Sequence, residues 1–212
     1  MSADSYLTVP AEAEDEFTEK RSRFIGAIRP VKTEEEAQAF IRERCKTYWD
    51  AKHNVHAYVL DGGNLCRFSD DGEPQGTAGI PVLDVLRKEG LTDCVVVVTR
   101  YFGGILLGGG GLVRAYSHAA KIAVDAAGVV EMRLCLLGEI TCDYSQYGFL
   151  PALLAEQGAT VVDTRFEEAV TVCFSLPKEA RGHLEAALTD RSAGRLTAVF
   201  TGEERVPCPV ER

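Results

Sequence analysis

The order of apolar and polar residues along the first part of the chain predicts strands alternating with helices. All five residues from Cys94 to Val98 are apolar, which is typical of one fully buried strand. Thr33, followed three residues later by Glu36, forms a capping box, which predicts the start of a helix. Further strands are predicted at residues 23–31, 55–60 and 65–69, with a short helix from Pro81 to Gly90 and a longer one over residues 112–127. Two loops remain, at residues 69–79 and 99–111.

The second part of the chain has a more regular pattern. Strands are predicted at residues 134–142, 159–166, 169–176 and 194–202, with helices after Asp143 and after Pro177. The order strand, helix, strand, strand, helix, strand is typical of the split-βαβ or ferredoxin-like fold. The sequence therefore predicts an α+β protein with one domain at residues 1–133 and a second, ferredoxin-like domain at residues 134–212.

Length and composition are typical of a globular protein. The chain has 212 residues, of which 46% are hydrophobic and 26% are charged, and this excludes wholesale disorder. No apolar run approaches the ~18 residues of a transmembrane helix, and the acidic N-terminal stretch lacks the apolar core of a signal peptide. The seven cysteines include no CxxC pair, which indicates reduced thiols rather than a zinc site or disulfides. We therefore expect a cytoplasmic protein with no membrane partner.

The charge balance limits how this chain could bind nucleic acid. It has 32 acidic residues against 23 basic ones, a net charge of −9, which argues against unspecific binding to a polyphosphate. Binding would have to come from cations that cluster locally. The basic run from Lys20 to Arg23 is more simply interpreted as the solvated start of a strand, but it extends a positive surface if the fold brings it near Arg100.

The most unusual stretch of the sequence is the glycine-rich loop and its flanks, at residues 99–116. Six glycines lie within the nine positions 103–111, a density that indicates positive φ angles or a close approach of the backbone to another group. The loop precedes a helix, whose free N–H groups favour an anion. Arg100 and Arg114 flank the loop and could bind phosphate, while Tyr101, Phe102 and Tyr116 could stack on bases. No GxGxxG or P-loop frame is present, and a turn that only lets the helix pack on the sheet remains an equal alternative.

A second loop, at residues 67–79, is rich in acids. Asp70, Asp71 and Glu73 could hold a divalent cation, but a turn with solvated acids is the favoured interpretation. Thr77 could act as a nucleophile only with a base beside it. His53 and His56 face opposite sides of a strand and so do not form a metal pair. The sequence therefore predicts no metal and no cofactor.

Four segments together resemble the IMPACT/YigZ family. They are EKRSRFIG (19–26), HNVHAY (53–58), RFSDDGEPQGTAGIPVL (67–83) and VVVVTRYFGGILLGGGGLVRAY (95–116). The resemblance implies an N-terminal domain of the left-handed βαβ superfamily, which includes a domain of a small-subunit ribosomal protein and domain IV of elongation factor G. It also implies a ferredoxin-like C-terminal partner domain. The family usually has a cysteine in the second segment, where this chain has Val55 or His56, which weakens any role for a cysteine there.

The resemblance also implies a link to translation. Eukaryotic relatives are translational regulators that bind the scaffold activating the amino-acid-starvation kinase. No catalytic residue set comes with the family. For bacterial two-domain members, the resemblance supports nucleic-acid or ribosome binding only as a proposal.

Three hypotheses for the function follow. The leading one is a non-enzymatic regulator that binds RNA or the ribosome; its candidate residues are Arg100, Tyr101, Phe102, Gly103, Gly104, Gly110, Gly111 and Arg114, with Arg67 and Lys20 as additions. The second is an enzyme or sensor for a small phosphorylated metabolite, which a compact pocket between the two loops would favour. The third is a module that docks a translation factor. The leading hypothesis requires Arg100 and Arg114 to converge on one exposed, electropositive surface; guanidinium groups turned inward onto carboxylates would make the loop a scaffold.

Overall fold

The computed structural model describes residues 5–210 and divides the chain into two compact units. Most of the first unit is Tyr6–Glu131, and most of the second is Met132–Val206. Each unit combines strands with helices, so the predicted α+β class is confirmed, while the two named folds stay predictions. No helix among the described residues is both long enough and apolar enough to cross a membrane.

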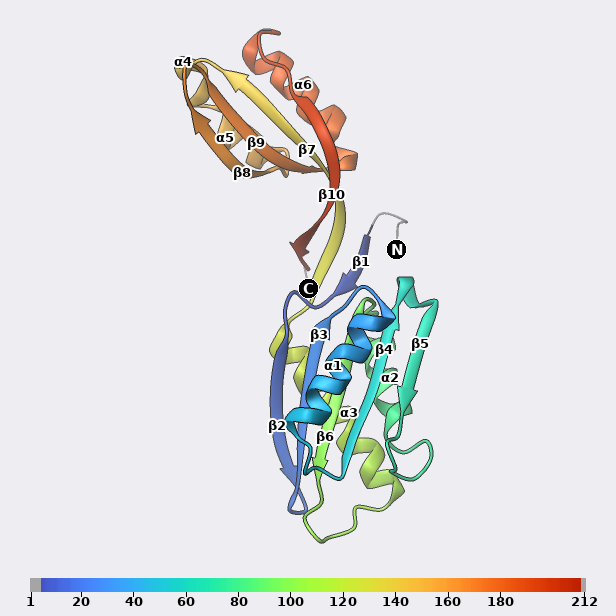
Figure 1. Ribbon diagram of the computed structural model, residues 1–212. Coiled ribbons are helices and arrows are strands. Elements are labelled where there is room, and N and C mark those ends of the chain that lie inside the picture. The colour runs from blue at the N-terminus through green and yellow to red at the C-terminus, as the bar shows by residue number, and fades with distance from the viewer. Residues whose placement is uncertain (1–4, 211–212) are drawn as a thin grey trace. The chain divides into compact units, whose positions relative to one another are not determined.

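The first unit is built on a five-stranded antiparallel sheet. Its strands are β2 (Ala13–Glu19), β3 (Ser22–Pro30), β4 (His53–Leu60), β5 (Leu65–Ser69) and β6 (Cys94–Tyr101), in the spatial order β2-β3-β6-β4-β5. A short 3-10 turn, η1 (Asp61–Gly63), joins β4 to β5. Helix α1 (Glu34–Thr47) covers one face of the sheet, and α2 (Gly79–Lys88) and α3 (Gly109–Ala127) cover the other (Figure 1). The sheet is therefore buried on both faces.

Strand β6 lies at the centre of this sheet and explains its two cores. Val96 and Val98 face α2 and α3, while Val95 and Val97 face α1, because successive side chains of a strand point to opposite faces. All four valines are buried, as the apolar run predicts. Gly26 on β3 lets α3 come close, since a Cβ at this position would lie 2.1 Å from the backbone oxygen of Ala119.

Helix α1 begins where the sequence predicts, although its capping box is only half formed. The Thr33 side chain accepts a hydrogen bond from the backbone N–H of Glu36 (3.2 Å). The Glu36 carboxylate instead accepts from the N–H of Lys32 (2.6 Å), one residue before the cap. The start of the helix was therefore predicted correctly, and one partner of the box was not.

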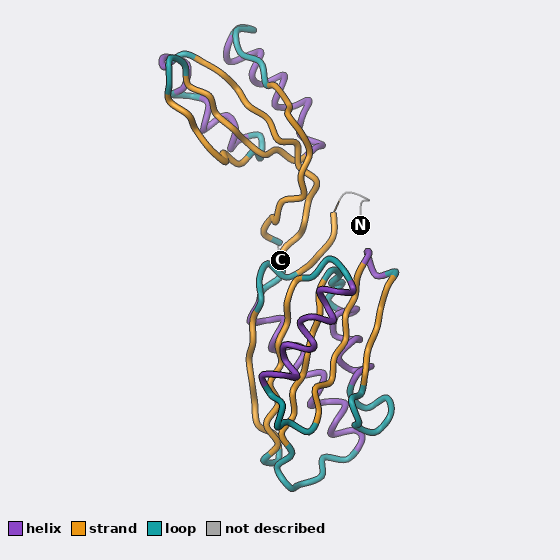
Figure 2. Tube along the Cα trace, viewed as in Figure 1, coloured by secondary structure: helices purple, strands orange, loops and turns teal. Residues whose placement is uncertain are grey.

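The second unit follows the order of elements that the sequence predicts. It contains β7 (Val130–Cys142), α4 (Tyr144–Tyr147), α5 (Leu150–Glu156), β8 (Thr160–Phe166), β9 (Val170–Pro177), the 3-10 turn η2 (Lys178–Ala180), α6 (Arg181–Ser192) and β10 (Val199–Pro209). Within this unit the strand order is β7-β9-β8, and β10 pairs with β7. The short strand β1 (Ser5–Thr8) belongs mostly to the first unit. Leucines of α5 and α6 pack on one face of this sheet. Figure 2 shows the helices and strands of the unit along the Cα trace. The last strand is shifted from its predicted position at residues 194–202. Strand β10 starts at Val199 and continues past residue 202 to Pro209.

Candidate functional site

Three strands place a row of side chains across one end of the first sheet. Arg100 on β6 lies between Phe24 on β3 and His53 on β4 in the strand register. Cross-strand neighbours point to the same face, here the face covered by α2 and α3. The sequence predicted that the strand ends at Val98, which left Arg100 in a loop. In fact β6 continues to Tyr101, and the alternation that buries Val96 and Val98 turns Arg100 inward as well.

Arg100 belongs to a buried cluster that we call the polar centre, made of Arg100, Glu73, Tyr116 and His53. Arg100 is 5% exposed, and its Nη1 donates to Glu73 Oε1 (2.5 Å). The Tyr116 hydroxyl donates to the same Glu73 oxygen (2.7 Å). Burial and the neighbouring Glu73 carboxylate raise the pKa of Tyr116, so its hydroxyl stays protonated as a donor. Arg100 therefore neutralises a carboxylate inside the protein.

The backbone holds His53 in one orientation. Its Nδ1 lies 2.7 Å from the backbone oxygen of Asp71. A carbonyl oxygen only accepts, so Nδ1 bears the proton of this bond. The other ring nitrogen, Nε2, faces Glu73 Oε1 at 3.9 Å, beyond hydrogen-bond distance. Nε2 is therefore available to a further partner.

The acidic loop is fixed by its own carboxylates. Asp70 accepts hydrogen bonds from the N–H groups of Gly76 (2.8 Å), Ala78 (3.1 Å) and Gly79 (2.8 Å), and so caps α2 from a distance. Asp71 accepts from the N–H of Asn54 (2.6 Å).

The favoured interpretation of this loop as a turn with solvated acids is wrong for Glu73, which is buried against Arg100. The Thr77 hydroxyl donates to the backbone oxygen of Pro74 (2.6 Å), and no base partner for it is described. Among the described residues, no three His, Cys, Asp or Glu side chains are grouped to hold a metal.

A pocket of about 370 Å³ lies between the two loops that the sequence singled out. His53, Glu73 and Arg100 of the polar centre line it, together with Lys52. Both loops and the start of α3 contribute its apolar lining, which consists of Pro74, Phe102, Leu106, Leu107 and Leu112. Gly108 and Gly109, where α3 begins, complete the wall. The pocket is the feature that was expected to favour a small ligand over an open basic face.

Arg114 lies apart from this pocket. Its side chain is exposed and lines a second hollow of about 280 Å³ with Lys20, Glu19 and His118 among its neighbours. The expectation that Arg100 and Arg114 converge on one exposed surface is therefore wrong. The reason is the phase of β6, which sends Arg100 into the interior, while Arg114 is on the outer side of α3.

The three predicted stacking rings also separate. Tyr116 is fully buried, in edge contact with Phe24, and cannot meet a base. Tyr101 is half-buried, and its hydroxyl donates to Asp50 (2.7 Å) next to α1. Phe102 is 46% exposed, so it is the ring that offers an open face.

The glycines of the loop have two different roles. A Cβ on Gly103 would lie 2.0 Å from the backbone carbon of Arg21, so the loop can pack against the β2–β3 hairpin only with glycine there. The N–H of Gly103 also donates to the Ser22 hydroxyl (3.2 Å). Gly104 and Gly108 have positive φ angles of 83° and 74°. Gly110 and Gly111 form the first turn of α3 instead.

The tip of the β2–β3 hairpin adds two cations to this end of the domain. Lys20 and Arg21 are exposed and have positive φ angles of 47° and 64°, a conformation that non-glycine residues rarely adopt. Neither they nor Arg114 form an ion pair within residues 5–210. We call Lys20, Arg21 and Arg114 the cationic rim.

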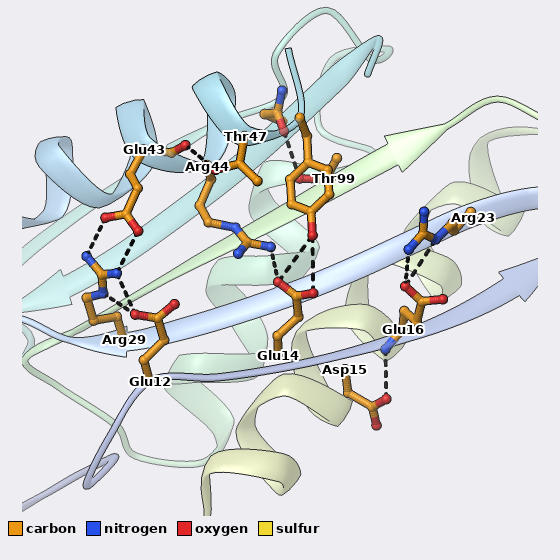
Figure 3. Close-up of polar contacts among 12 residues, drawn as sticks. Glu12, Glu14, Asp15, Glu16, Arg23, Arg29, Glu43, Arg44, Thr47 and Thr99 are labelled. Carbon is orange, nitrogen blue, oxygen red and sulfur yellow. Dashed lines mark hydrogen bonds and ion pairs between the residues drawn. The ribbon is translucent and has the colours of Figure 1, made fainter. Parts of the chain in front are cut away.

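Cations on the opposite, α1 side of the sheet are arranged differently (Figure 3). Arg29 pairs with Glu12 and Glu43, and Arg44 pairs with Glu14. Arg67, a predicted site residue, also belongs to this side, since it opposes Tyr58 on β4 and lies 3.8 Å from Glu34 of α1. The structure does not bring Arg67 to the loop.

Comparison with known proteins gives consistent matches over both units. Residues 20–124 match the Impact N-terminal domain, and residues 140–195 match a family described as a domain of unknown function, DUF1949. The chain is 42% identical to the IMPACT family member YvyE of Bacillus subtilis over 78% of this chain and 77% of that protein. It is 36% identical to the IMPACT family member YigZ of Escherichia coli over 84% and 88% of the two chains.

A solved structure extends this similarity to three dimensions. A crystal structure described as that of a hypothetical protein superposes with a TM-score of 0.60 at 32% identity and covers 95% of this chain and 99% of that one. The Protein IMPACT homolog of Dictyostelium discoideum is 36% identical over 51% of this chain and 31% of its own length. The similarity to that protein thus concerns about half of the present chain.

Proposed function

Because the chain belongs to the IMPACT family, we propose that it takes part in translation or its regulation by binding single-stranded RNA, free or in the ribosome. The cationic rim contacts phosphates in this proposal, and Phe102 stacks on a base. Arg100, Tyr116 and Arg67 are left out of the surface, since two of them are buried and the third lies on the other face of the sheet. The role is one of binding and involves no reaction.

The observation that supports the proposal most is the absence of acidic partners for the rim among the described residues. Acids at this end of the domain are engaged elsewhere: Glu16 pairs with Arg23 (2.5 Å), and Glu73 with Arg100. The Asp70 carboxylate accepts backbone N–H groups. Glu19 is the exposed acid that shares the hollow of Lys20 and Arg114. A protein with a net charge of −9 can in this way offer a local positive surface.

Phe102 supplies the second part of the proposed surface. The Arg100 guanidinium lies 5.5 Å from the centre of the Phe102 ring, and this cation–π contact stabilises the position of the ring. Its exposed part lies on the loop that packs, through Gly103, against the hairpin of Lys20 and Arg21. Stacking on an aromatic ring adds affinity for RNA without dependence on salt.

The test is the salt dependence of binding to a labelled single-stranded RNA. Arg114→Ala should make the slope of log K against log salt less negative by about 0.7, the value for one lost phosphate contact. Lys88→Ala is the matched control, because Lys88 is exposed, has no ion pair with a described residue and ends α2. Phe102→Ala should weaken binding about tenfold or more at every salt concentration and leave the slope unchanged. Equal slopes for Arg114→Ala and Lys88→Ala would contradict the proposal.

A protein partner is the alternative that this test leaves to a second experiment. The full-length chain is used to capture partners from a lysate, with and without ribonuclease. Partners held through RNA should be lost after digestion. A translation factor that stays bound, and that Arg114→Ala does not release, would favour a protein-docking module instead.

A further inference from the structure

We infer that the pocket between residues 70–78 and 102–109 binds a small organic anion with an apolar body. This site goes beyond the proposed RNA surface: it shares Phe102 with that surface and uses none of the cationic rim. It joins an uncapped helix N-terminus, a buried histidine with an unused ring nitrogen and an apolar wall.

Helix α3 supplies donors for the anionic group. The helix is 19 residues long and starts after Gly108, which gives it no side-chain cap. The N–H groups of Gly109, Gly110 and Gly111 have no acceptor among the residues that the structure describes. By contrast, Thr33 caps α1 and Asp70 caps α2. An anion beside Gly109 would therefore meet free N–H groups and the positive end of the helix dipole.

One buried side chain that lines the pocket provides an independent sign of a ligand. His53 is 8% exposed and lines the pocket, and its Nε2 has no hydrogen bond within the described part of the chain, because Glu73 lies 3.9 Å away. The polar groups of buried side chains are normally paired, so an unpaired ring nitrogen on a pocket-lining histidine indicates a missing partner.

The charges of the pocket determine how the ligand lies. The Glu73 carboxylate repels an anionic group at the polar centre, so the anion belongs at the α3 end. A hydroxyl or amine on the ligand would donate to His53 Nε2. The apolar part would contact Phe102 and Leu106, which are 46% and 81% exposed. A volume of about 370 Å³ suits a molecule with a single ring or a short chain.

Phenyl phosphate is the probe, since it joins an anionic group to an apolar ring; inorganic phosphate and phenol test each half alone. Calorimetric titration of the full chain should give saturable binding of phenyl phosphate that is at least tenfold tighter than that of either half. Phenylacetate shows whether the site prefers a carboxylate or a phosphate ester. No saturation by either anion, or equal binding of inorganic phosphate, would overturn the inference.

Substitutions at one glycine test the role of the helix N-terminus. Gly109→Pro removes one N–H at the helical position where proline is well tolerated. Gly109→Ala is the control that keeps the N–H, and a Cβ there meets only Thr77 Cγ2 at 3.9 Å. Phenyl phosphate should bind to Gly109→Ala as to the unchanged chain and about tenfold more weakly to Gly109→Pro. Equal affinity for both variants would contradict the placement of the anion.

Two surface variants keep the test valid if Gly109→Pro folds poorly. Leu106→Ser, at an exposed position, should weaken phenyl phosphate binding and leave inorganic phosphate unaffected. Lys20→Ala should weaken RNA binding and leave phenyl phosphate binding unchanged, so failure of the RNA proposal and failure of the pocket are distinguishable. A loss of phenyl phosphate binding in Lys20→Ala would show that the anion lies on the rim and not in the pocket.

Discussion

The polar centre and the cationic rim use the same kinds of residue for opposite purposes. Arg100 and Arg114 come from one glycine-rich segment, yet one is 5% exposed and paired with Glu73, and the other is exposed without an acidic partner among the described residues. The difference arises from the element that holds each residue. A strand facing two helices turns Arg100 inward, and the outer side of α3 turns Arg114 outward. The same residue type therefore supports the fold in one place and is free to bind in the other.

The largest effect that separates the two regions is expected for Arg100→Ala. This change leaves the Glu73 carboxylate buried without its cation, which should lower the free energy of unfolding by about 3–5 kcal/mol. Arg114→Ala, at an exposed position, should change it by less than about 0.5 kcal/mol. Urea unfolding of both variants measures the contrast. If Arg100→Ala unfolded with the same midpoint as Arg114→Ala, Arg100 would not be the buried counter-ion.

A smaller effect is expected when the hydroxyl of Tyr116 is removed. Tyr116→Phe deletes a buried hydrogen bond to a charged oxygen and should cost about 2 kcal/mol. Tyr101→Phe is the matched control, because its hydroxyl bonds to Asp50 at the surface and should matter by less than about 0.5 kcal/mol. Thermal unfolding compares the two. Equal losses would mean that the polar centre is as solvated as the surface.

The smallest effect concerns the hairpin tip and has the opposite sign. Lys20 and Arg21 hold positive φ angles that Asn and Gly adopt at lower cost. Changing Lys20→Asn together with Arg21→Gly should therefore raise the free energy of unfolding by about 1 kcal/mol. RNA binding should weaken in the same variant, since two cations are lost. A more stable variant with undiminished RNA affinity would remove the hairpin from the proposed surface.

Much of the fold could be predicted from local patterns in the sequence. The apolar run at Cys94 to Val98, the cap at Thr33 and the strands predicted at residues 159–166 and 169–176 each appear where expected, whereas β10 is shifted toward the C-terminus. The candidate site was harder to predict than the fold, because the geometry of the site depends on how far β6 extends. A threonine and an arginine after four valines are typical of the start of a loop. Nothing local in the sequence shows that Glu73, 27 residues earlier, pairs with Arg100.

One signal for the polar centre was nevertheless present in the sequence. Val96, Val98 and Arg100 have the alternation of one strand face, and continuing it would have placed Arg100 inside. His53 and Tyr116 join through the sheet register and the α3 helix, which only the tertiary structure reveals. The basic run from Lys20 to Arg23 is more simply interpreted from the sequence as the solvated start of a strand, and it extends a positive surface only if the fold brings it near Arg100. The lack of ion-pair partners for Lys20 and Arg21 among the described residues could not be predicted from the sequence.

The most direct test of the contrast between rim and centre is the salt dependence of RNA binding by one combined variant. Changing Lys20, Arg21 and Arg114 to alanine should make the slope of log K against log salt less negative by about 2, as expected for three lost phosphate contacts. The control changes the exposed cations Arg42 and Lys88 to alanine, and its slope should equal that of the unchanged chain. If the combined variant and the control shifted the slope by the same amount, the rim would be no more than general surface charge, which would contradict its role in RNA binding.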